Sequence, residues 1–281
     1  MKKFYVLFIC VVFAAQYSLL SAQTTIMKLW KGGSVTMYYN TVDVDSVTFE
    51  TRTENEKQYL GNGVYLINGH RFVDLGLPSG LLWAETNVGA ETAADDGNYY
   101  AWAEIEPQSI NDYSWESYKY AIIGQSGTPE ITKYTNINEP GYLDKTDDAA
   151  YVNWGTFSRM PTEDDFKELT NSSYTEWTWT SMTTSLGGTI KGVKVTSTIN
   201  GNSIFLPASG YRHNGELLYR GTYGYCWSSS HLNALKPPCD PIAKYFSFSS
   251  TNHGISETSL YAASSDYGLC DGKTIRPVAE P

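Results

Sequence analysis

Short runs of alternating apolar and polar residues dominate this chain, and glycine or asparagine separates most of them. Alternation with a period of two predicts β-strands that bury one face. Two dipeptides between such runs, Gly32-Gly33 and Asn68-Gly69, predict β-hairpins, the second with the two positive-φ positions of a type I′ turn. Further strands are predicted from WTWTSM, GVKVTSTI, SIFLPAS, YCWSSS and KYFSFSS, which lie between Trp177 and Ser250.

Two segments carry helical signals. The stronger one runs from Pro161 to Leu169, where Thr162 can cap the first turn, Asp165 lies three positions later and acidic residues fill the first turn. The weaker one runs from Asp147 to Trp154. The stretch from Ser109 to Asp147 is rich in Tyr, Gly and Asn with weak periodicity, and it predicts mainly loop. Two short helices beside mostly antiparallel strands with long loops predict an α+β domain.

The N-terminal part divides into three segments before the main domain. Residues 1–22 have a basic start, a short apolar core and small residues before Gln23, which predicts a secretory signal peptide. Residues 23–50 predict a small β unit, built on the hairpin at Gly32-Gly33 and a third strand from Val44 to Glu50. Residues 51–59 are polar and predict a linker. Residues 60–281 then form the main domain.

Charge and composition narrow the set of partners. Removal of residues 1–22 takes away two lysines and no acids, so the net charge moves from −10 to −12. An acidic chain without a basic cluster argues against nucleic acid and anionic membranes. No second long apolar run follows the signal peptide, so we expect no membrane insertion after cleavage. The 22 Tyr and 8 Trp suit a β-rich exported domain and also carbohydrate binding, although most of the rings are expected in the core.

An ordered series of motifs spans the C-terminal two thirds of the chain, and no single motif carries the pattern. The motifs are VDLGLPSGLLWAETNVG (Val73 to Gly89), GNYYAWAE (Gly97 to Glu104), NWG (Asn153 to Gly155), RMPT (Arg159 to Thr162), NGNSIFLPASGYR (Asn200 to Arg212), WSSS (Trp227 to Ser230) and IRPV (Ile275 to Val278). Together they resemble the Fibrobacter succinogenes major paralogous domain, a C-type-lectin-like module of exported Bacteroidetes proteins. The resemblance implies a C-type-lectin-like fold for the main domain.

Three cysteines follow the predicted signal peptide. An exported protein can form disulfides, and an odd count leaves one thiol over. Cys239 lies in a proline-rich loop and Cys270 in a glycine-flanked turn, so we predict that these two pair. Cys226 precedes Trp227 in an expected core strand, which predicts a buried free thiol. The three residues lack the spacing of zinc ligands, and we expect neither a metal site nor a cofactor.

Calcium-dependent C-type lectins use a Glu-Pro-Asn or Gln-Pro-Asp loop and a Trp-Asn-Asp strand. This chain has Glu106-Pro107-Gln108 far upstream, and it has the WSSS motif where the acidic strand would lie. The calcium sugar site is therefore not expected. Two loop clusters, Asp95 to Asn98 and Asp144 to Asp148, have oxygen ligands for a structural Ca²⁺, but solvated loop acids are the simpler interpretation.

No catalytic residue is predicted. The segment from Gly124 to Thr128 resembles a nucleophile elbow, but it ends in threonine, with no helix after it. The related formylglycine-generating enzymes use paired cysteines in an arrangement that this chain does not reproduce. A glycosidase needs two neighbouring carboxylates, and nothing in the sequence marks such a pair. A hydrolase is thus the least favoured hypothesis.

The best binding candidates follow the GYR motif. Tyrosine combines a flat apolar face with a hydroxyl, which suits stacking on sugars or anchoring a protein partner, and arginine can hold acidic groups. In lectin-like folds the variable C-terminal loops usually form the ligand face. The predicted ligand-binding residues are Tyr211, Arg212, Tyr219, Arg220, Tyr223, Tyr225 and His231. The competing interpretation is structural, because alternate tyrosines in strands usually face the core.

The remaining motif residues are expected to stabilise the fold. We predict core positions for most of Trp83, Trp102, Trp154, Trp177, Trp179 and Trp227, and we expect Arg159 and Arg276 to satisfy carbonyls and acids around the sheet. The sequence thus predicts an exported, non-enzymatic binding module whose partner is a glycan or a surface protein. A structural or assembly component of the cell surface is the alternative. Periplasm, cell surface and medium all remain open as locations, and the oligomeric state is open as well.

Overall fold

The computed structural model describes residues 26–31, 34–40, 57–125, 127–135, 141–233, 241–258 and 268–280. The chain divides into two compact units, Met1–Thr51 and Arg52–Pro281. In the first unit, β1 (Ile26–Lys31) and β2 (Ser34–Asn40) pair antiparallel, which confirms the predicted N-terminal hairpin. The predicted signal peptide and the predicted third strand, Val44 to Glu50, lie outside the described residues.

The largest sheet of the second unit has six strands, and all of its neighbouring strands are antiparallel. This sheet contains strands from both ends of the second unit. Its C-terminal strand lies between a strand near residue 83 and a strand near residue 159, and it pairs with both. In spatial order the strands are β3 (Lys57–Gly61), β4 (Val64–Ile67), β5 (His70–Asp74), β6 (Leu82–Ala84), β18 (Val278–Ala279) and β9 (Ser158–Arg159).

The start of this sheet tests two local predictions. Asn68 and Gly69 have φ angles of 50° and 85°, as a type I′ turn between β4 and β5 requires, so that hairpin is confirmed. Residues 57–59, which we predicted to end the linker, instead belong to β3 and pair with β4. A second Asn-Gly turn, at Asn62 and Gly63, joins these two strands, and a polar composition alone did not reveal it.

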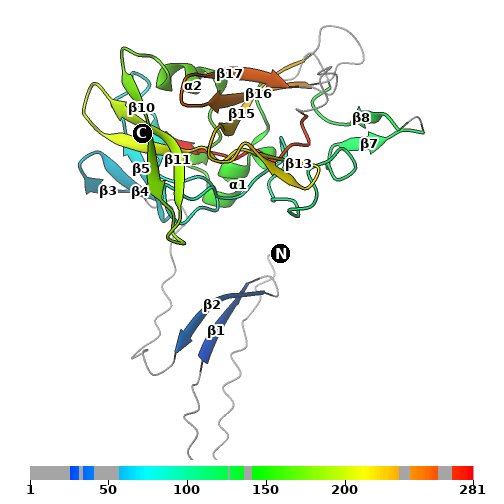
Figure 1. The fold of residues 1–281 in the computed structure, drawn as a ribbon, viewed down its shortest axis with the longest axis horizontal. Helices are drawn as coiled ribbons and strands as arrows, with labels where there is room; N and C mark the ends of the chain where they lie inside the picture. Colours follow the sequence, from blue (N-terminus) through cyan, green and yellow to red (C-terminus); the bar gives the residue numbers. More distant parts are fainter. Residues whose placement is uncertain are drawn as a thin grey trace, which may run out of the picture. The chain divides into compact units, whose positions relative to one another are not determined.

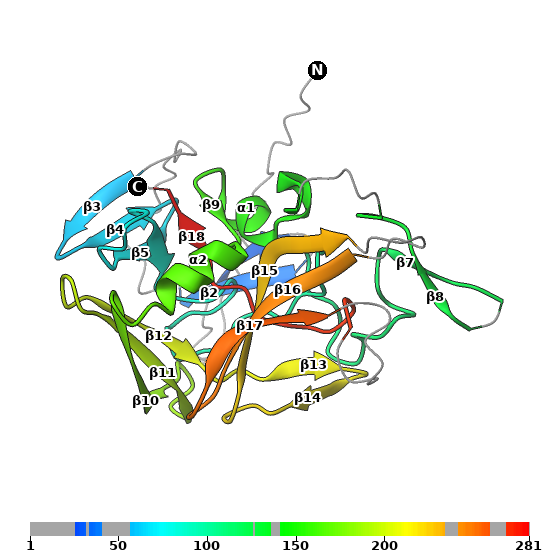
Figure 2. The same cartoon turned by 90° about the horizontal axis from the view of Figure 1, so that it is seen from above.

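Two three-stranded antiparallel sheets follow. One contains β10 (Thr175–Thr183), β11 (Thr189–Ser197) and β12 (Ser203–Pro207), and the other contains β15 (Gly224–Asn233), β16 (Pro241–Phe248) and β17 (His253–Thr258). All five strands predicted between Trp177 and Ser250 are therefore present, and β13 (Tyr211–His213), β14 (Glu216–Leu218) and β17 are additional ones. The stretch predicted as mainly loop contains a short hairpin, β7 (Ala121–Ile123) and β8 (Pro129–Ile131), which projects from the rest of this unit in Figures 1 and 2.

Both predicted helices are present. A 3₁₀ turn, η2 (Lys145–Asp147), leads into α1 (Ala149–Trp154), whose first turn is capped by the Asp148 carboxylate. The second helix, α2 (Glu163–Leu169), begins with the predicted capping pair: the Thr162 hydroxyl accepts from the Asp165 amide, and the Asp165 carboxylate accepts from the Thr162 amide. The described part of the second unit is thus an α+β structure of mostly antiparallel sheets with two short α-helices.

Two apolar clusters form the core of the second unit. One contains Trp102 and Trp227. The other brings Trp83 of β6 against Phe166 of α2, whose ring stacks on Phe246 of β16 at a centroid distance of 4.7 Å. The predicted core positions are confirmed for Trp83, Trp102, Trp154 and Trp227, whereas Trp177 and Trp179 are partly buried. None of the helices that the structure describes has the length and apolar character of a membrane-spanning segment.

Asp147 anchors the long tyrosine-rich stretch that precedes α1. Its carboxylate accepts hydrogen bonds from the hydroxyls of Tyr120 (2.8 Å) and Tyr134 (2.5 Å), and it pairs with the Lys133 ammonium. Burial by itself would raise the pKa of Asp147, but the three donors outweigh burial and lower it. The segment at Tyr120 and the segment at Lys133 and Tyr134 are therefore bonded to η2, the turn that leads into α1.

Asp147→Asn is expected to lower the free energy of unfolding at pH 7 by about 1 to 3 kcal/mol, because the donors lose their charged acceptor. Since the folded pKa lies below the unfolded value of about 3.9, the carboxylate stabilises the fold above that pH. This stabilisation is lost as the pH falls through the folded pKa. Urea unfolding at pH values between about 2 and 7 should thus show a steeper acid loss in wild type than in Asp147→Asn. Asp144→Asn, at an exposed neighbour, is the control, and identical acid profiles for wild type and Asp147→Asn would contradict the assignment.

Candidate functional site

The seven predicted ligand residues fall into exposed and buried groups. Tyr219 and Tyr223 are 51% and 42% exposed, and the Arg220 side chain is 41% exposed. Tyr211, Tyr225 and His231 are instead buried, which corrects their assignment as ligand contacts. Tyr211 and Tyr225 pack in the first core cluster, and His231 lies against the rings of Trp102 and Tyr134, because these positions face inward from β13 (Tyr211–His213) and β15.

Arg212 also differs from its prediction. Its guanidinium lies 5.0 Å from the centre of the Tyr99 ring, and one terminal nitrogen is 3.5 Å from the carbonyl oxygen of Ile110. The side chain is half-buried, and its backbone pairs with Gly272 in both directions. Arg212 therefore joins two chain segments, as the structural interpretation expected.

The exposed residues lie on a short loop between two strands. A hairpin of β13 and β14 (Glu216–Leu218) turns at Asn214 and Gly215, and residues 219–223 then lead into β15. The Tyr219 carbonyl accepts from the amides of Thr222 and Tyr223, both at 3.0 Å. The Tyr223 carbonyl accepts from Gly210, and Gly221 donates to the Ala208 carbonyl. The loop is thus held by its own turn and by a neighbouring segment.

Buried rings support the exposed ones. Tyr219 stacks on Tyr211 at a centroid distance of 6.0 Å and an interplanar angle of 26°. Tyr223 stacks on Tyr225 at 6.1 Å and 27°, and Tyr219 and Tyr223 meet edge to face at 5.6 Å. The two buried rings, those of Tyr211 and Tyr225, also pack edge to face, with their centroids 5.2 Å apart. We call these four residues the tyrosine cluster, in which two fixed rings hold two others at the surface.

Tyr219 has a backbone conformation that is rare for a large side chain. Its φ angle is 58°, in the left-handed region that favours glycine and asparagine. Such a conformation costs about 1–3 kcal/mol and persists where surrounding contacts enforce it, often at a binding site. Here the hydrogen bonds to the Tyr219 carbonyl and the stack on Tyr211 enforce it. The exposed ring of Tyr219 is therefore held in one orientation by its contacts with the rest of the loop.

Arg220 provides charge beside the two exposed rings. Its Nε donates to Oδ2 of Asp96 at 2.6 Å, and in the described part of the chain its two terminal nitrogens have no partner. Burial by itself would lower the pKa of Arg220, but the Asp96 carboxylate raises it overall, so the side chain stays cationic. The other carboxylate oxygen of Asp96 is buried and has no hydrogen-bond partner among the described residues. Sequence analysis considered Asp96 only within the Asp95 to Asn98 cluster and missed its pairing with Arg220, because the two residues lie 124 positions apart.

Several acids of the two clusters considered for calcium accept hydrogen bonds from the protein. Asp95 accepts from the amide and hydroxyl of Thr92 and from the amide and hydroxyl of Ser185. Asp148 accepts from the amides of Tyr151 and Met160. Asp95, Asp147 and Asp148 are thus bonded within the fold, whereas the Asp144 side chain is 64% exposed, as expected for a solvated loop acid. Within the described ranges, no three His, Cys, Asp or Glu side chains converge in a way that could hold a metal ion.

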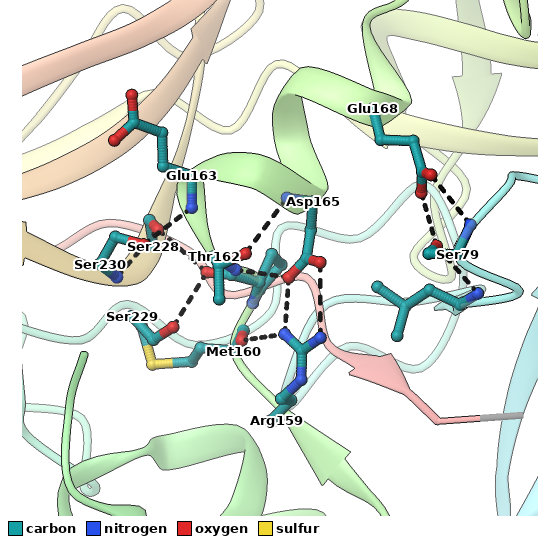
Figure 3. A network of polar contacts seen from close by, with 12 residues as sticks. Ser79, Arg159, Met160, Thr162, Glu163, Asp165, Glu168, Ser228, Ser229 and Ser230 are labelled. Carbon is teal, nitrogen blue, oxygen red and sulfur yellow. Dashed lines mark hydrogen bonds and ion pairs between the residues drawn. The ribbon is translucent and has the colours of Figure 1, made fainter. Parts of the chain in front are cut away.

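The WSSS motif positions α2. The hydroxyls of Ser228 and Ser229 donate to the carbonyl of Pro161, at 3.0 and 3.4 Å, and the Ser230 hydroxyl accepts from the amide of Glu163 at 2.9 Å. Figure 3 shows these serines gathered at the start of the helix. The WSSS segment therefore satisfies backbone groups at the N-terminus of α2.

Arg159 and Arg276 have the structural positions that the sequence predicted. Arg159 pairs with Asp165 at 2.6 Å and donates to the carbonyl of Met160, as Figure 3 shows. Arg276 is completely buried and donates four hydrogen bonds to oxygen acceptors. Arg276 therefore joins segments far apart in the sequence, whereas these partners of Arg159 are local.

Two predictions involve residues outside the described ranges. Cys226 and Cys270 are buried thiols, and the position predicted for Cys226 is confirmed. Cys270 is a free thiol in the structure, which corrects the predicted Cys239–Cys270 disulfide; Cys239 itself is not among the described residues. Ser126 of the segment that resembles a nucleophile elbow is also outside them, while its neighbours form the turn between β7 and β8.

Comparison with known proteins identified no relative of this chain, so the site is interpreted from its geometry. No family model matches this chain, and the searches of curated proteins and of solved structures found no match either.

Proposed function

We propose that this protein is an exported, non-enzymatic binding module that recognises glycans through Tyr219, Arg220 and Tyr223. The observation that carries the proposal is the exposed ring of Tyr219, which is held in a left-handed backbone conformation and stacked on a buried ring. We further propose that residues 60–281 form a C-type-lectin-like domain of the Fibrobacter succinogenes major paralogous family. The two short helices beside antiparallel sheets, and the structural positions of the WSSS and IRPV motifs, support this assignment.

The three side chains suit a sugar for separate reasons. The faces of Tyr219 and Tyr223 are apolar and can cover the C–H face of a pyranose, while their hydroxyls stay available for hydrogen bonds. The free terminal nitrogens of Arg220 can donate to hydroxyl or carboxylate oxygens of the same ligand. Because the loop is already ordered by hydrogen bonds, binding loses less conformational entropy than it would on a mobile loop.

The first experiment is binding of the purified protein to a broad array of immobilised glycans, with and without EDTA. Saturable binding that survives EDTA supports recognition by the tyrosines. Binding that EDTA abolishes would contradict this mechanism and require a calcium site. Absence of binding to every glycan would reject the proposed ligand class and favour a surface protein or a structural role at the cell surface.

Tyr219→Gly is expected to weaken glycan binding about tenfold, because the stacking face is removed. Its free energy of unfolding should change by no more than about 1 kcal/mol, since glycine adopts a φ of 58° without strain. Titration calorimetry and urea unfolding measure the two effects separately. Tyr223→Ala should weaken binding in the same way.

Tyr59→Ala is the matched control for these two variants. Tyr59 is 58% exposed and also packs on a second tyrosine, Tyr65, but it lies on β3 and has no arginine partner in the described residues. If Tyr59→Ala weakened binding as much as Tyr219→Gly, the binding surface would have been assigned wrongly.

A further inference from the structure

A pocket of about 340 Å³ lies in the second unit, away from the tyrosine cluster. Its walls come from the segment before η2, from α1, from β9 and from the C-terminal Glu280. Figure 2 draws α1 and β9 on the opposite side of this unit from β13 and β14. The volume is within the range of pockets that hold small ligands. None of the seven predicted ligand residues lines it, although Arg159, Thr162 and Ser229 of the sequence motifs do.

Three aromatic side chains give the pocket its apolar surface. Tyr142 is half exposed, and Tyr151 and Phe157 are partly buried. The backbone of Tyr142 forms a bridge with Ser230 of β15, and Tyr151 lies in α1, so two of the rings are carried by ordered elements. Ser158 also lines the pocket, and its buried hydroxyl has no hydrogen-bond partner in the described part of the chain. The walls thus offer flat apolar faces and one unused polar group.

Positive charge at the pocket comes from Lys145 and Arg159. Lys145 is exposed, with its ammonium 5.4 Å from the centre of the Tyr151 ring, and it forms no ion pair with any described residue. Two nitrogens of Arg159 are held by Asp165, as Figure 3 shows, whereas Nε contacts only Glu280, at 3.3 Å. The remaining acid, Asp148, is turned to backbone amides. Lys145 therefore carries an uncompensated charge.

Glu280 indicates what the pocket accepts. Its side chain is 66% exposed, and its contact with Arg159 is long for a charged hydrogen bond, so the contact contributes little to stability. A carboxylate that arrives with a ligand can replace it on Nε, and Lys145 lines the same pocket. Glu280 thus stands where an incoming carboxylate would bind, beside rings that can cover a flat ligand.

We propose that this pocket binds a small ligand in which a carboxylate is attached to a six-membered ring, the chemistry that uronic acids share with aromatic acids. The carboxylate replaces Glu280 at Arg159 Nε and pairs with Lys145. The ring packs between Tyr142, Tyr151 and Phe157. This site is separate from the proposed glycan surface, and it needs none of the residues of that surface.

The test is titration calorimetry of the purified protein with glucuronate, its methyl ester and 4-hydroxybenzoate. The acids are expected to bind at least about tenfold more tightly than the ester, because the ester has no charge for Lys145 or Arg159. Tighter binding of glucuronate assigns a sugar acid, and tighter binding of 4-hydroxybenzoate assigns an aromatic acid. Equal binding of acid and ester, or no binding of either acid, would overturn the proposal.

Two variants give opposite expectations. Glu280→Gln removes the competing carboxylate and should strengthen binding of the acids about threefold or more, whereas Lys145→Met should weaken it about tenfold. Both positions are exposed, so both variants should keep the unfolding midpoint of wild type. Weaker binding in Glu280→Gln would contradict the assigned position of the carboxylate.

Two controls separate this site from the rest of the molecule. Lys119→Met removes another exposed lysine that lies over a tyrosine ring, and it should leave binding of the acids unchanged. Tyr223→Ala should also leave it unchanged while weakening glycan binding. If Tyr223→Ala weakened both, the ligand would lie at the tyrosine cluster, and the pocket would be rejected as its site.

Discussion

Arg276→Met is expected to lower the free energy of unfolding of the second unit by about 3 to 4 kcal/mol. The guanidinium is completely buried and has no acidic partner among the described residues. It donates to the carbonyls of Ala84 (3.0 Å) and Glu85 (2.6 Å), beside β6, and to the side-chain oxygen of Asn87 (2.9 Å). Its last terminal nitrogen donates to the carbonyl of Phe205 in β12, at 3.0 Å.

The size of this effect follows from the acceptors that remain. Methionine fills much of the same space but donates no hydrogen bond, so buried oxygens in two different sheets lose a partner. Burial lowers the pKa of Arg276 to about 10, so the wild-type side chain is still cationic at neutral pH. The substitution also removes the free-energy cost of burying a cation. We therefore expect the loss in free energy of unfolding to be smaller than the sum of four hydrogen-bond contributions.

The measurement is urea unfolding followed by tryptophan fluorescence. Arg71→Met is the matched control. Its side chain is half exposed and pairs with the carboxylate of Glu85, whose backbone carbonyl is one of the acceptors of Arg276, and its loss should cost less than about 1 kcal/mol. If Arg276→Met does not fold, Arg276→Lys, which keeps a charge and part of the hydrogen bonds, should show an intermediate loss. Wild-type stability in either Arg276 variant would contradict the role given to this residue.

Lys273→Met is expected to destabilise the protein by about 3 to 5 kcal/mol, because it leaves a buried carboxylate without its cation. The ammonium of Lys273 lies 3.1 Å from Asp271 and 4.1 Å from the centre of the Trp227 ring, and Lys273 and Asp271 are both completely buried. The rings of Tyr245 and Tyr211 are 4.9 and 5.4 Å away. Burial lowers the pKa of Lys273, and the Asp271 carboxylate opposes that shift.

A second substitution distinguishes the lost charge from lost packing. Asp271 also accepts from the amide of Gly268 (2.8 Å) and contacts Nδ1 of His213 (2.9 Å). The double variant Asp271→Asn with Lys273→Met should be more stable than Lys273→Met alone, since no unpaired charge stays buried. Lys119→Met, an exposed lysine over the Tyr120 ring, should change stability by less than about 0.5 kcal/mol. A double variant less stable than Lys273→Met would show that the charge is not the cause.

Local signals predicted local structure well. The Asn68-Gly69 turn and the pair of Thr162 and Asp165 involve residues no more than three positions apart, so the sequence contains the whole interaction. The longer strands between Trp177 and Ser250 were also predictable, because alternation is a local pattern, whereas the short strands β13 and β14 were not predicted. Residues 57–59 were misassigned, since their strand exists only through pairing with β4.

The candidate site was predictable only in part. The sequence identified the tyrosine-rich region, but not which rings face solvent, because that depends on what covers each strand. Tyr211 and Tyr225 are buried, and Tyr219 and Tyr223 are not. The pocket beside Glu280 combines segments near residues 145, 158 and 280, and no local pattern relates them.

By itself, the sequence determined the element types, the turns and caps, and the acidic, tyrosine-rich character of the chain, because these depend on residues within a few positions of each other. The tertiary structure decided which side chains became neighbours. It placed Asp96 on Arg220, put Lys273 among three aromatic rings and held Tyr219 in a left-handed conformation. The physical reason is that burial, ion pairing and backbone strain depend on contacts between distant segments, and those contacts form only when the sheets pack together.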